Sequence, residues 1–561
     1  MTTSLAVLPS LLLIGGGLVL PLLRGPLRGA AVLVLPLAAL GLVWRVPDGV
    51  ALAVPFLGYE LALVKGDALS RLFATVFSLM AFAGGLFALN QKRIVELSAA
   101  FCYAGGAIGV VFAGDLVTVF IFWELMAIAS TVVIWSAGPS ARAAGLRYAA
   151  IHLFGGILLM AGIAGQIADT GSLAFGRMTL DSVPRWLILA GFLVNVAAPP
   201  FSSWLPDAYV ESSWSGMVFL SAFTTKTAVY VLLRGYPGTE LLIYLGLFMV
   251  FYGIVYAILE NDMRRILAYS IVNQVGFMVT GAGIGTEMAL NGAAAHAFAH
   301  IIYKALLLMS AGSVLYMTGK RKCTDLGGLF RTMPITAACG IVGALSISAF
   351  PLTSGFVSKS MISEAAGMAH LEVIWYLLAA ASAGVFLHAG VKFPWFVFFQ
   401  KDSGLRPPDP PWNMRVAMLF FAALCIGLGV APGPLYAMLP FKVDFVPYTG
   451  SHVVFQLQLL LFSGLAFFLM LSWLQRTLTI TLDVDWLYRR LGVVVLRQLD
   501  RWVQASWNGF AGAAARSARI IVDWTYRHHG ADGIMARTWP TGLMAFWTTI
   551  VLAAYLLLSY L

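Results

Sequence analysis

Apolar segments of about 20 residues recur along almost the whole chain, with short polar stretches between them. A segment of this length crosses a hydrocarbon core of about 30 Å as an α-helix. The segment from Leu241 to Leu259 carries no charged residue at all. The pattern predicts an all-α polytopic membrane protein. We expect about sixteen spans, at residues 4–23, 27–46, 70–89, 93–113, 115–136, 147–168, 186–204, 215–234, 240–259, 265–285, 289–317, 333–356, 372–398, 414–432, 453–475 and 541–560.

The composition excludes a soluble globular protein. The 561 residues are 60% hydrophobic and 11% charged, with a mean hydropathy of +0.87, whereas soluble domains carry about 25% charged residues. The net charge of +10 does not indicate nucleic acid as a partner, because Lys and Arg collect in alternate loops, as they do in membrane proteins.

Loops that follow odd-numbered spans are expected to be cytoplasmic because they hold most of the basic residues. They contain Arg24, Arg28, Lys92, Arg93, Arg142, Arg264, Arg265, Lys320, Arg321, Lys322, Lys401, Arg406, Arg489 and Arg490. The loop after the seventh span, with Asp207 and Glu211, departs from the alternation. The distribution predicts a multi-pass protein of the inner (cytoplasmic) membrane of the cell, with the lipid bilayer around it and both termini on the outer side.

Prolines interrupt two spans at comparable places. Pro199 and Pro200 interrupt the seventh span, and Pro351, followed by Gly355, interrupts the twelfth. Paired broken helices indicate an internal repeat. We expect six regions: N-terminal transmembrane helices (1–92), a first repeat (93–235), a second repeat (240–400), C-terminal core helices (401–475), an amphipathic lateral segment (476–540) and a terminal transmembrane anchor (541–561).

The segment between the last two predicted spans mixes aromatic and basic residues. From Asp483 to Thr538, tryptophans and aliphatic residues alternate with arginines. This pattern is typical of a helix that lies along a membrane surface or against partner subunits. Gly509 and Gly512 are candidate break points in it, and an ordinary cytoplasmic loop with two shorter helices is the alternative.

An acid lies near the middle of the fifth span. An ionisable group at the centre of a bilayer costs several kcal/mol and is a candidate for function. Asp115, the other acid of this span, is nine positions from Glu124 and faces the opposite side of the helix. Glu124 therefore needs a partner on another helix, or it stays protonated. A purely structural, hydrogen-bonded carboxyl is the alternative.

Two lysines also lie within predicted spans, and a third follows just after one. Lys226 is central in the eighth span, where burial favours its neutral form, so its charge can be switched. Lys359 follows the interruption of the twelfth span, where freed backbone groups can line a wet cavity. Lys392 lies four residues after His388 on the thirteenth span, where the two could form an exit to the surface. The alternative for each is a lysine that reaches the membrane interface.

The eleventh span carries three titratable residues at helical spacing. His296, His300 and Lys304 are separated by four residues each, which places them within about 40° of one another on one helix face. Two histidines and a lysine in this arrangement can form a relay with bound waters. Packing histidines are the alternative.

Motifs of soluble enzymes are absent from the sequence. There is no P-loop, dinucleotide fingerprint or nucleophile motif, and the four cysteines lack metal-ligand spacing. We therefore expect no cofactor, no metal site and no catalytic residue in this chain, and any coupled redox activity would belong to other subunits.

Seven motifs carry a family resemblance over nearly the whole chain. They are WELM (123–126), PFSSWLPDA (200–208), TKTAVYVLLR (225–234), DMRRILAYS (262–270), HAFAHIIYK (296–304), TDLGGL (324–329) and SGFVSKSMI (354–362). In order and spacing they resemble the antiporter-like subunits of respiratory complex I, membrane-bound hydrogenases and multisubunit Na⁺/H⁺ antiporters. The core is more similar to the D-type antiporter subunits. The tail resembles the lateral helix and final span of the largest complex I antiporter-like subunit.

The resemblance implies a core of fourteen helices with two inverted five-helix repeats and a hydrophilic axis along the membrane. It implies that Glu124 is the acid of the first half, Lys226 a connecting lysine, and Lys359 the lysine of the second broken helix. It assigns His300 and Lys304 to the relay of the second half. The partners it implies are other membrane subunits, protons and possibly Na⁺.

One position departs from the family pattern. The family commonly has a lysine in the first broken helix as the partner of the fifth-span glutamate, and here Asn195 stands in its place. A neutral amide can order water but cannot carry the charge. Three explanations are open. Lys226 could take over the pairing with Glu124, the first half-channel could be silent, or the subunit could belong to a branch with another coupling scheme.

The sequence thus leads to a proton-translocating or cation/proton antiport subunit as the first hypothesis. A non-conducting scaffold is the second, and Asn195 favours it. An accessory subunit of a redox enzyme or of an inorganic-carbon uptake complex is the third, because partner subunits define those functions.

Overall fold

The computed structural model describes residues 8–474 and 482–561. The chain divides into two compact units, Met1–Val484 and Asp485–Leu561. The start of the first predicted span (4–7), the last residue of the fifteenth and the first residues of the predicted lateral segment (475–481) lie outside the described residues.

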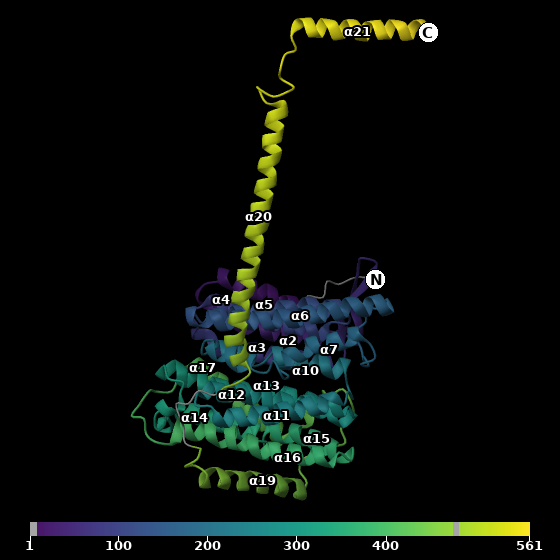
Figure 1. Cartoon of the computed structure of the whole chain (residues 1–561). Coiled ribbons are helices and arrows are strands. Elements are labelled where there is room, and N and C mark those ends of the chain that lie inside the picture. The colour runs from purple at the N-terminus through teal and green to yellow at the C-terminus, as the bar shows by residue number, and fades with distance from the viewer. Residues whose placement is uncertain (1–7, 475–481) are drawn as a thin grey trace. The chain divides into compact units, whose positions relative to one another are not determined.

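The first unit is built almost entirely of helices (Figure 1). They are α1 Pro9–Val19, α2 Gly25–Val43, α3 Ala68–Phe87, α4 Ile94–Phe112, α5 Leu116–Trp135, α6 Arg142–Thr170, α7 Val183–Val196, α8 Trp204–Ala208, α9 Gly216–Leu220, α10 Thr224–Gly235, α11 Leu241–Leu259, α12 Met263–Ile284, α13 Glu287–Thr318, α14 Pro334–Ile347, α15 Ser354–Met368, α16 Glu372–Val385, α17 Trp412–Val430, α18 Gly433–Tyr436 and α19 Gly450–Leu469.

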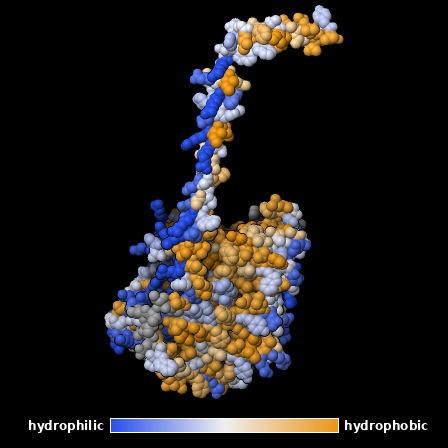
Figure 2. All heavy atoms as spheres, viewed as in Figure 1, coloured by the Kyte–Doolittle hydropathy of each residue, from blue (hydrophilic) through white to orange (hydrophobic). Residues whose placement is uncertain are grey.

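Thirteen helices of the described chain are long and apolar enough to cross a membrane. Three further apolar helices, Pro9–Leu22, Val183–Val196 and Pro334–Ile347, are shorter. Each predicted span coincides with one of these helices, which confirms the all-α polytopic fold. Figure 2 shows apolar residues over the middle of the first unit and hydrophilic residues toward the helix ends, as expected for a protein surrounded by lipid.

A β-hairpin lies in the predicted loop between the second and third spans, where the sequence analysis placed no element. Strand β1 (Gly49–Phe56) pairs antiparallel with β2 (Tyr59–Gly66). Leu57 and Gly58 connect the strands, and both have positive φ, at 48° and 83°. A two-residue turn with positive φ matches the right-handed twist of the strands. The hairpin was missed because the search was for long apolar segments.

Three predicted spans are interrupted helices. Helix α7 ends at Val196, before Pro199 and Pro200, and α14 ends at Ile347, before Pro351. The predicted eighth span, in which no break was expected, consists of α9 and α10 with residues 221–223 between them. Each break frees carbonyl groups inside the protein, and a buried polar group needs a hydrogen-bond partner.

The two halves of the first unit lie side by side. Figure 1 shows α2 to α7 and α10 on one side and α14, α15, α16 and α19 on the other, with α12 and α13 along the junction. Helix α13 contacts α3 of the first half and α15 and α17 of the second. Charged and polar side chains on α13 therefore lie in the middle of the protein.

The second unit consists of α20 (Val493–His529) and α21 (Thr541–Tyr560), with a π-helical turn at Leu487–Gly492 before α20. Helix α20 has 37 residues and runs through Gly509 and Gly512 without interruption, so the candidate break points in this segment were wrong. No residue of α20 or α21 is buried within the described unit.

A half-buried acid at the start of α3 anchors this helix to α10. Asp67 caps α3 through the Ser70 amide, at 2.8 Å, and accepts a bond of 2.6 Å from Arg234. Burial raises the pKa of the Asp67 carboxyl, but the Arg234 charge and the Ser70 amide together outweigh it and hold the pKa below its ordinary value of 3.8. A carboxyl with a lowered pKa stabilises the fold above its ordinary pKa and loses this effect as the pH falls through the lowered value.

We therefore expect Asp67→Asn to lower the stability of the purified protein in detergent by about 1 kcal/mol at neutral pH. The difference from wild type should shrink as the pH falls below 3.8. Thermal unfolding at several pH values measures both effects. Asp48→Asn is the matched control, because Asp48 pairs with Arg71 but its side chain is 76% exposed. Equal losses in the two variants would contradict the role of Asp67.

Candidate functional site

Helix α13 carries the central part of the site. His296, His300 and Lys304 lie on one face of this helix, and all three are fully buried. Nδ1 of His296 is 3.1 Å from Oγ of Ser358 on α15. The Lys304 ammonium donates a bond of 2.6 Å to Oγ of Ser270 on α12. Two of the three residues at the predicted relay spacing, His296 and Lys304, thus contact polar groups on two neighbouring helices.

Polar residues of α12 complete this relay. Nε2 of His296 is 3.1 Å from Oε1 of Gln274, and the Tyr303 hydroxyl donates to the same oxygen at 3.1 Å. The Gln274 amide in turn donates to Asn273. The sequence analysis did not assign Ser270, Asn273, Gln274 or Tyr303. The helical spacing of Ser270, Asn273 and Gln274 within an apolar span is the signal that could have identified the first three.

His300 has no hydrogen-bond partner in the described structure, although both of its ring nitrogens are buried. Its ring lies edge-on to Tyr303, with centroids 5.2 Å apart. Lys226 and Lys304 lie close enough to repel a positive charge on the ring. A buried imidazole without a partner is an unusual feature, and it is suited to accepting or passing on a proton through water.

Three of the lysines bind backbone carbonyls at the ends of helices. Lys226 donates to the Ser221 carbonyl at 2.6 Å, just after α9, and Lys359 to the Ile347 carbonyl at 3.0 Å, at the end of α14. Lys392 donates to three carbonyls around the end of α11, at Ala257 (3.1 Å), Ile258 and Glu260 (2.6 Å). The C-terminal end of a helix carries partial negative charge. Broken and terminating helices thus supply the partners of these lysines.

The buried lysines form no salt bridge in the described part of the chain, although the Glu260 carboxyl lies near Lys392. Among the ion pairs of the described residues, none joins a carboxylate to Lys226, Lys304, Lys359 or Lys392. These lysines are at most 3% exposed. Lys359 also lies 4.7 Å from the ring centre of Phe277, in a cation–π arrangement. His388 lies near Lys304, Lys359 and Lys392 and bonds the Gly384 carbonyl at 2.8 Å. The lysines and histidines form a row from α10 to the π-helical turn at Phe386–Lys392.

Glu124 lies apart from this row. It is half-buried on α5, and its Oε1 has no hydrogen-bond partner among the described residues. The carboxyl packs against Gly156 of α6, where an added Cβ would lie 2.1 Å from Oε1. Lys226 is bound to Ser221 and Thr225 and makes no ion pair with Glu124 in the described structure. The direct Glu124–Lys226 pairing considered in the sequence analysis is therefore not formed.

Asn195 is buried on α7 at 3% exposure, and its Oδ1 is a second acceptor without a partner in the described chain. His152 of α6, which the sequence analysis overlooked, is also buried, with Nε2 unbonded and its ring stacked on Tyr148. Buried polar atoms without protein partners are expected to bind ordered water. The first half thus offers polar atoms for water-mediated contacts but has no lysine on α7.

Hydroxyl groups lie between the first half and Lys226. Ser130 and Tyr148 are 2.8 Å apart, Tyr148 lies 3.5 Å from Oγ1 of Thr224, and Thr224 bonds Tyr103. Thr225, the next residue along the chain, accepts a bond of 3.1 Å from Lys226. We name Tyr103, Ser130, Tyr148 and Thr224 the hydroxyl cluster. None of its members was predicted, because they come from four separate helices.

Metal ligands do not gather in the described part of the chain, which contains no group of three His, Cys, Asp or Glu side chains that could hold a metal ion. The four cysteines are buried. The polar groups of the site are suited to proton exchange and to hydration of ions.

Residues 113–386 match the family model described as NADH:quinone oxidoreductase/Mrp antiporter, TM. The chain is 30% identical over 443 residues to the A/B-type component of a probable K⁺/H⁺ antiporter of Rhizobium meliloti, covering 72% of this chain and 44% of that protein. The chain therefore spans less than half the length of this relative. It is also 28% identical to the D-type component of the Na⁺/H⁺ antiporter of Alkalihalophilus pseudofirmus, covering 70% of this chain and 83% of that protein.

The fold is also found in solved structures. A chain of the membrane-bound sulfane sulfur reductase, an archaeal respiratory membrane complex, matches with a TM-score of 0.71 and 24% identity, over 98% of this chain and 99% of that chain. Coverage of this extent includes both units of the present chain. The match shows a shared fold.

Proposed function

Because residues 113–386 match the family model described as NADH:quinone oxidoreductase/Mrp antiporter, TM, we propose that the chain belongs to this family and is an ion-translocating subunit of a multisubunit membrane complex. Protons or monovalent cations move along the buried row by paired changes of protonation and hydration. Other membrane subunits of the same complex are its partners. The complex lies in the cytoplasmic membrane, with both termini of this chain on the outer side. The relatives named as components of K⁺/H⁺ and Na⁺/H⁺ antiporters support cation/proton exchange as the activity.

The observation that carries the proposal is the way in which the buried lysines are held. A lysine in a salt bridge is strongly favoured in its charged form. Lys226, Lys359 and Lys392 instead bind carbonyl groups, and Lys304 binds a hydroxyl. These neutral partners can accept a hydrogen bond from an ammonium or from an amine. The proton can therefore leave each lysine without stranding a buried carboxylate, as a relay requires.

We further propose that the hydroxyl cluster and bound water join Glu124 to Lys226. Hydroxyl groups both donate and accept hydrogen bonds, so a connected set can pass a proton along. In this scheme Asn195 orders water beside Glu124 and carries no charge itself. In this scheme, hydroxyl groups and water take the place of a direct ion pair between Glu124 and a lysine on α7.

Lys226→Met tests this proposal at the junction of the two halves. We expect the initial rate of ion exchange by the intact complex in proteoliposomes to fall about tenfold, because the connection between the hydroxyl cluster and His300 is lost. Collapse of an imposed pH gradient, followed with a fluorescent dye, measures the rate. Lys320→Met, on an exposed loop, is the matched control and should leave the rate unchanged. A rate equal to that of wild type in the Lys226 variant would contradict the proposed path.

A scaffold is the second candidate, favoured by Asn195 and by the 37 residues of α20, which bury no side chain within their own unit. An amphipathic helix of this length can hold neighbouring subunits together. The scaffold role predicts that removal of α20 and α21 disassembles the complex while substitutions in the buried row leave transport unchanged. Native gels of the truncated complex, run beside the transport assay, separate the two candidates.

A further inference from the structure

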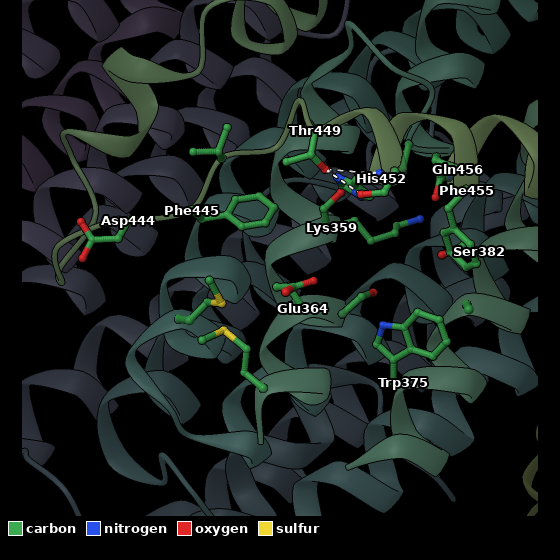
Figure 3. A pocket seen from close by; sticks show the side chains of 18 residues that line it. Lys359, Glu364, Trp375, Ser382, Asp444, Phe445, Thr449, His452, Phe455 and Gln456 are labelled. Carbon is green, nitrogen blue, oxygen red and sulfur yellow. Dashed lines mark hydrogen bonds between the residues drawn. The ribbon is translucent and has the colours of Figure 1, made fainter. Parts of the chain in front are cut away.

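A cavity of about 600 Å³ opens beside Lys359, between α15, α16, α19 and the segment that precedes α19 (Figure 3). Lys359 and Glu364 enter it from α15, Ser382 from α16 and Gln456 from α19. Figure 3 shows the Lys359 nitrogen on the side of Ser382 and Gln456, with Glu364 beneath. The cavity therefore brings the last lysine of the broken helix together with oxygen-bearing side chains from two further helices.

Two serines and a glutamine that line this cavity donate hydrogen bonds to backbone carbonyls. Ser360 donates to the Phe356 carbonyl, and Ser382 donates to the Leu378 carbonyl at 3.0 Å. Nε2 of Gln456 donates to the Ser348 carbonyl at 3.3 Å. These residues are between 5% and 9% exposed. Their oxygens are left as acceptors in the cavity, and oxygen acceptors are what a hard cation requires.

The charged groups around the cavity can balance one positive charge at a time. Glu364 forms no ion pair among the described residues. Asp444, also on the lining, pairs with Lys442 at 3.1 Å, so it adds little net charge. A single free carboxylate balances a monovalent ion. A divalent ion would be opposed by the Lys359 ammonium in the same cavity.

We propose that this cavity binds a monovalent cation such as Na⁺ or K⁺ at Glu364 and the Ser360, Ser382 and Gln456 oxygens, in competition with the proton carried by Lys359. The inference rests on the proposed function and adds to it the place where the cation enters the row. Two positive charges in one partly desolvated cavity repel each other. Binding of the cation therefore favours release of the Lys359 proton into the row, and return of the proton favours release of the cation.

The first test is the reactivity of an added cysteine, which does not depend on transport. The four native cysteines are at most 8% exposed, so their background labelling should be low. Ser363→Cys places a thiol on the cavity lining. In the intact complex we expect a cationic, membrane-impermeant methanethiosulfonate to label it. NaCl or KCl should slow the labelling at least about threefold relative to choline chloride at equal ionic strength. Ser451→Cys, at the same cavity, serves as the second reporter should the first variant fold poorly.

The second test removes the proposed cation ligand. Adding Glu364→Gln to the reporter should raise the cation concentration needed for protection at least about tenfold. Glu372→Gln makes the same change at an exposed acid that does not line the cavity, and it should leave protection unchanged. Equal protection by choline, or protection that survives Glu364→Gln, would overturn the cation site. Labelling is independent of ion flux, so a failure of the proposed transport function would appear separately, in the Lys226 variant.

Discussion

Replacing Lys304 with methionine is expected to lower the initial rate of ion exchange by the intact complex at least about a hundredfold. Lys304 is fully buried and donates a hydrogen bond to Ser270 at 2.6 Å. Methionine has a similar length and packs in an apolar site, so the amount of assembled complex should stay close to that of wild type. The variant removes the amine that follows His300 on α13 and bonds the α12 hydroxyl. Dye-monitored proton movement in proteoliposomes measures the loss.

Ser270→Ala is the companion to this experiment. It removes the partner of Lys304 and keeps the amine, so we expect an intermediate rate together with a shift in the pH dependence of transport. A purely structural role of Lys304 would leave the pH profile unchanged in both variants. An unchanged rate in the Lys304 variant, with the complex assembled, would refute conduction through the second half.

The positions of the membrane helices and of the titratable row could be predicted from sequence, because both are local patterns. A helix of about 20 apolar residues is recognised from its own composition. The spacing of His296, His300 and Lys304 follows from the period of one helix. Each of these residues lies where the spacing placed it, fully buried on one face of α13.

The partners of the row could not be predicted, because they are formed by segments far apart in the chain. Lys392 binds carbonyls more than 130 residues away, at the end of α11. Backbone carbonyls are also invisible in a sequence, which shows side chains only. The same limit applies to the hydroxyl cluster and to Glu124, whose carboxyl packs against Gly156 of another helix, α6. From the sequence, a charged residue is expected to have an oppositely charged side chain as its partner. In the structure, backbone carbonyls at helix ends are the partners of several of these charges.

The finding that the lysines bind carbonyls and hydroxyls, not carboxylates, changes the interpretation of Asn195. A lysine there was expected to pair with Glu124, and its absence suggested a break in the row. The structure places Lys226 beside His300 and Lys304 rather than beside Glu124. The row from Lys226 to Lys392 is thus contained in α10 and the second half. Asn195 affects how Glu124 is connected to this row and leaves the row itself intact.

Substitution of Gly355 with alanine is expected to have the largest effect on assembly. Gly355 lies in the first turn of α15, where it crosses the end of α14. An added Cβ would lie 1.8 Å from the Ser346 carbonyl oxygen. Backbone atoms cannot rotate away as a side-chain tip can, so the two helix segments must separate. We expect a loss of about 3 kcal/mol or more in stability, with displacement of Lys359 from the Ile347 carbonyl. Thermal unfolding and size-exclusion chromatography of the purified complex measure this loss.

Substitution of Gly367, on the same helix, is expected to leave the stability almost unchanged. A Cβ at Gly367 would meet its nearest neighbour, Cδ1 of Trp375, at 3.6 Å, which is an ordinary contact. Alanine has a higher helix propensity than glycine by about 1 kcal/mol. Gly367→Ala should therefore be neutral or slightly stabilising, whereas Gly355→Ala should reduce the recovered complex severely. Similar behaviour of the two variants would mean that the close crossing of α14 and α15 does not determine how the second broken helix folds. The same result would remove the reason for expecting Lys359 to be held at this break.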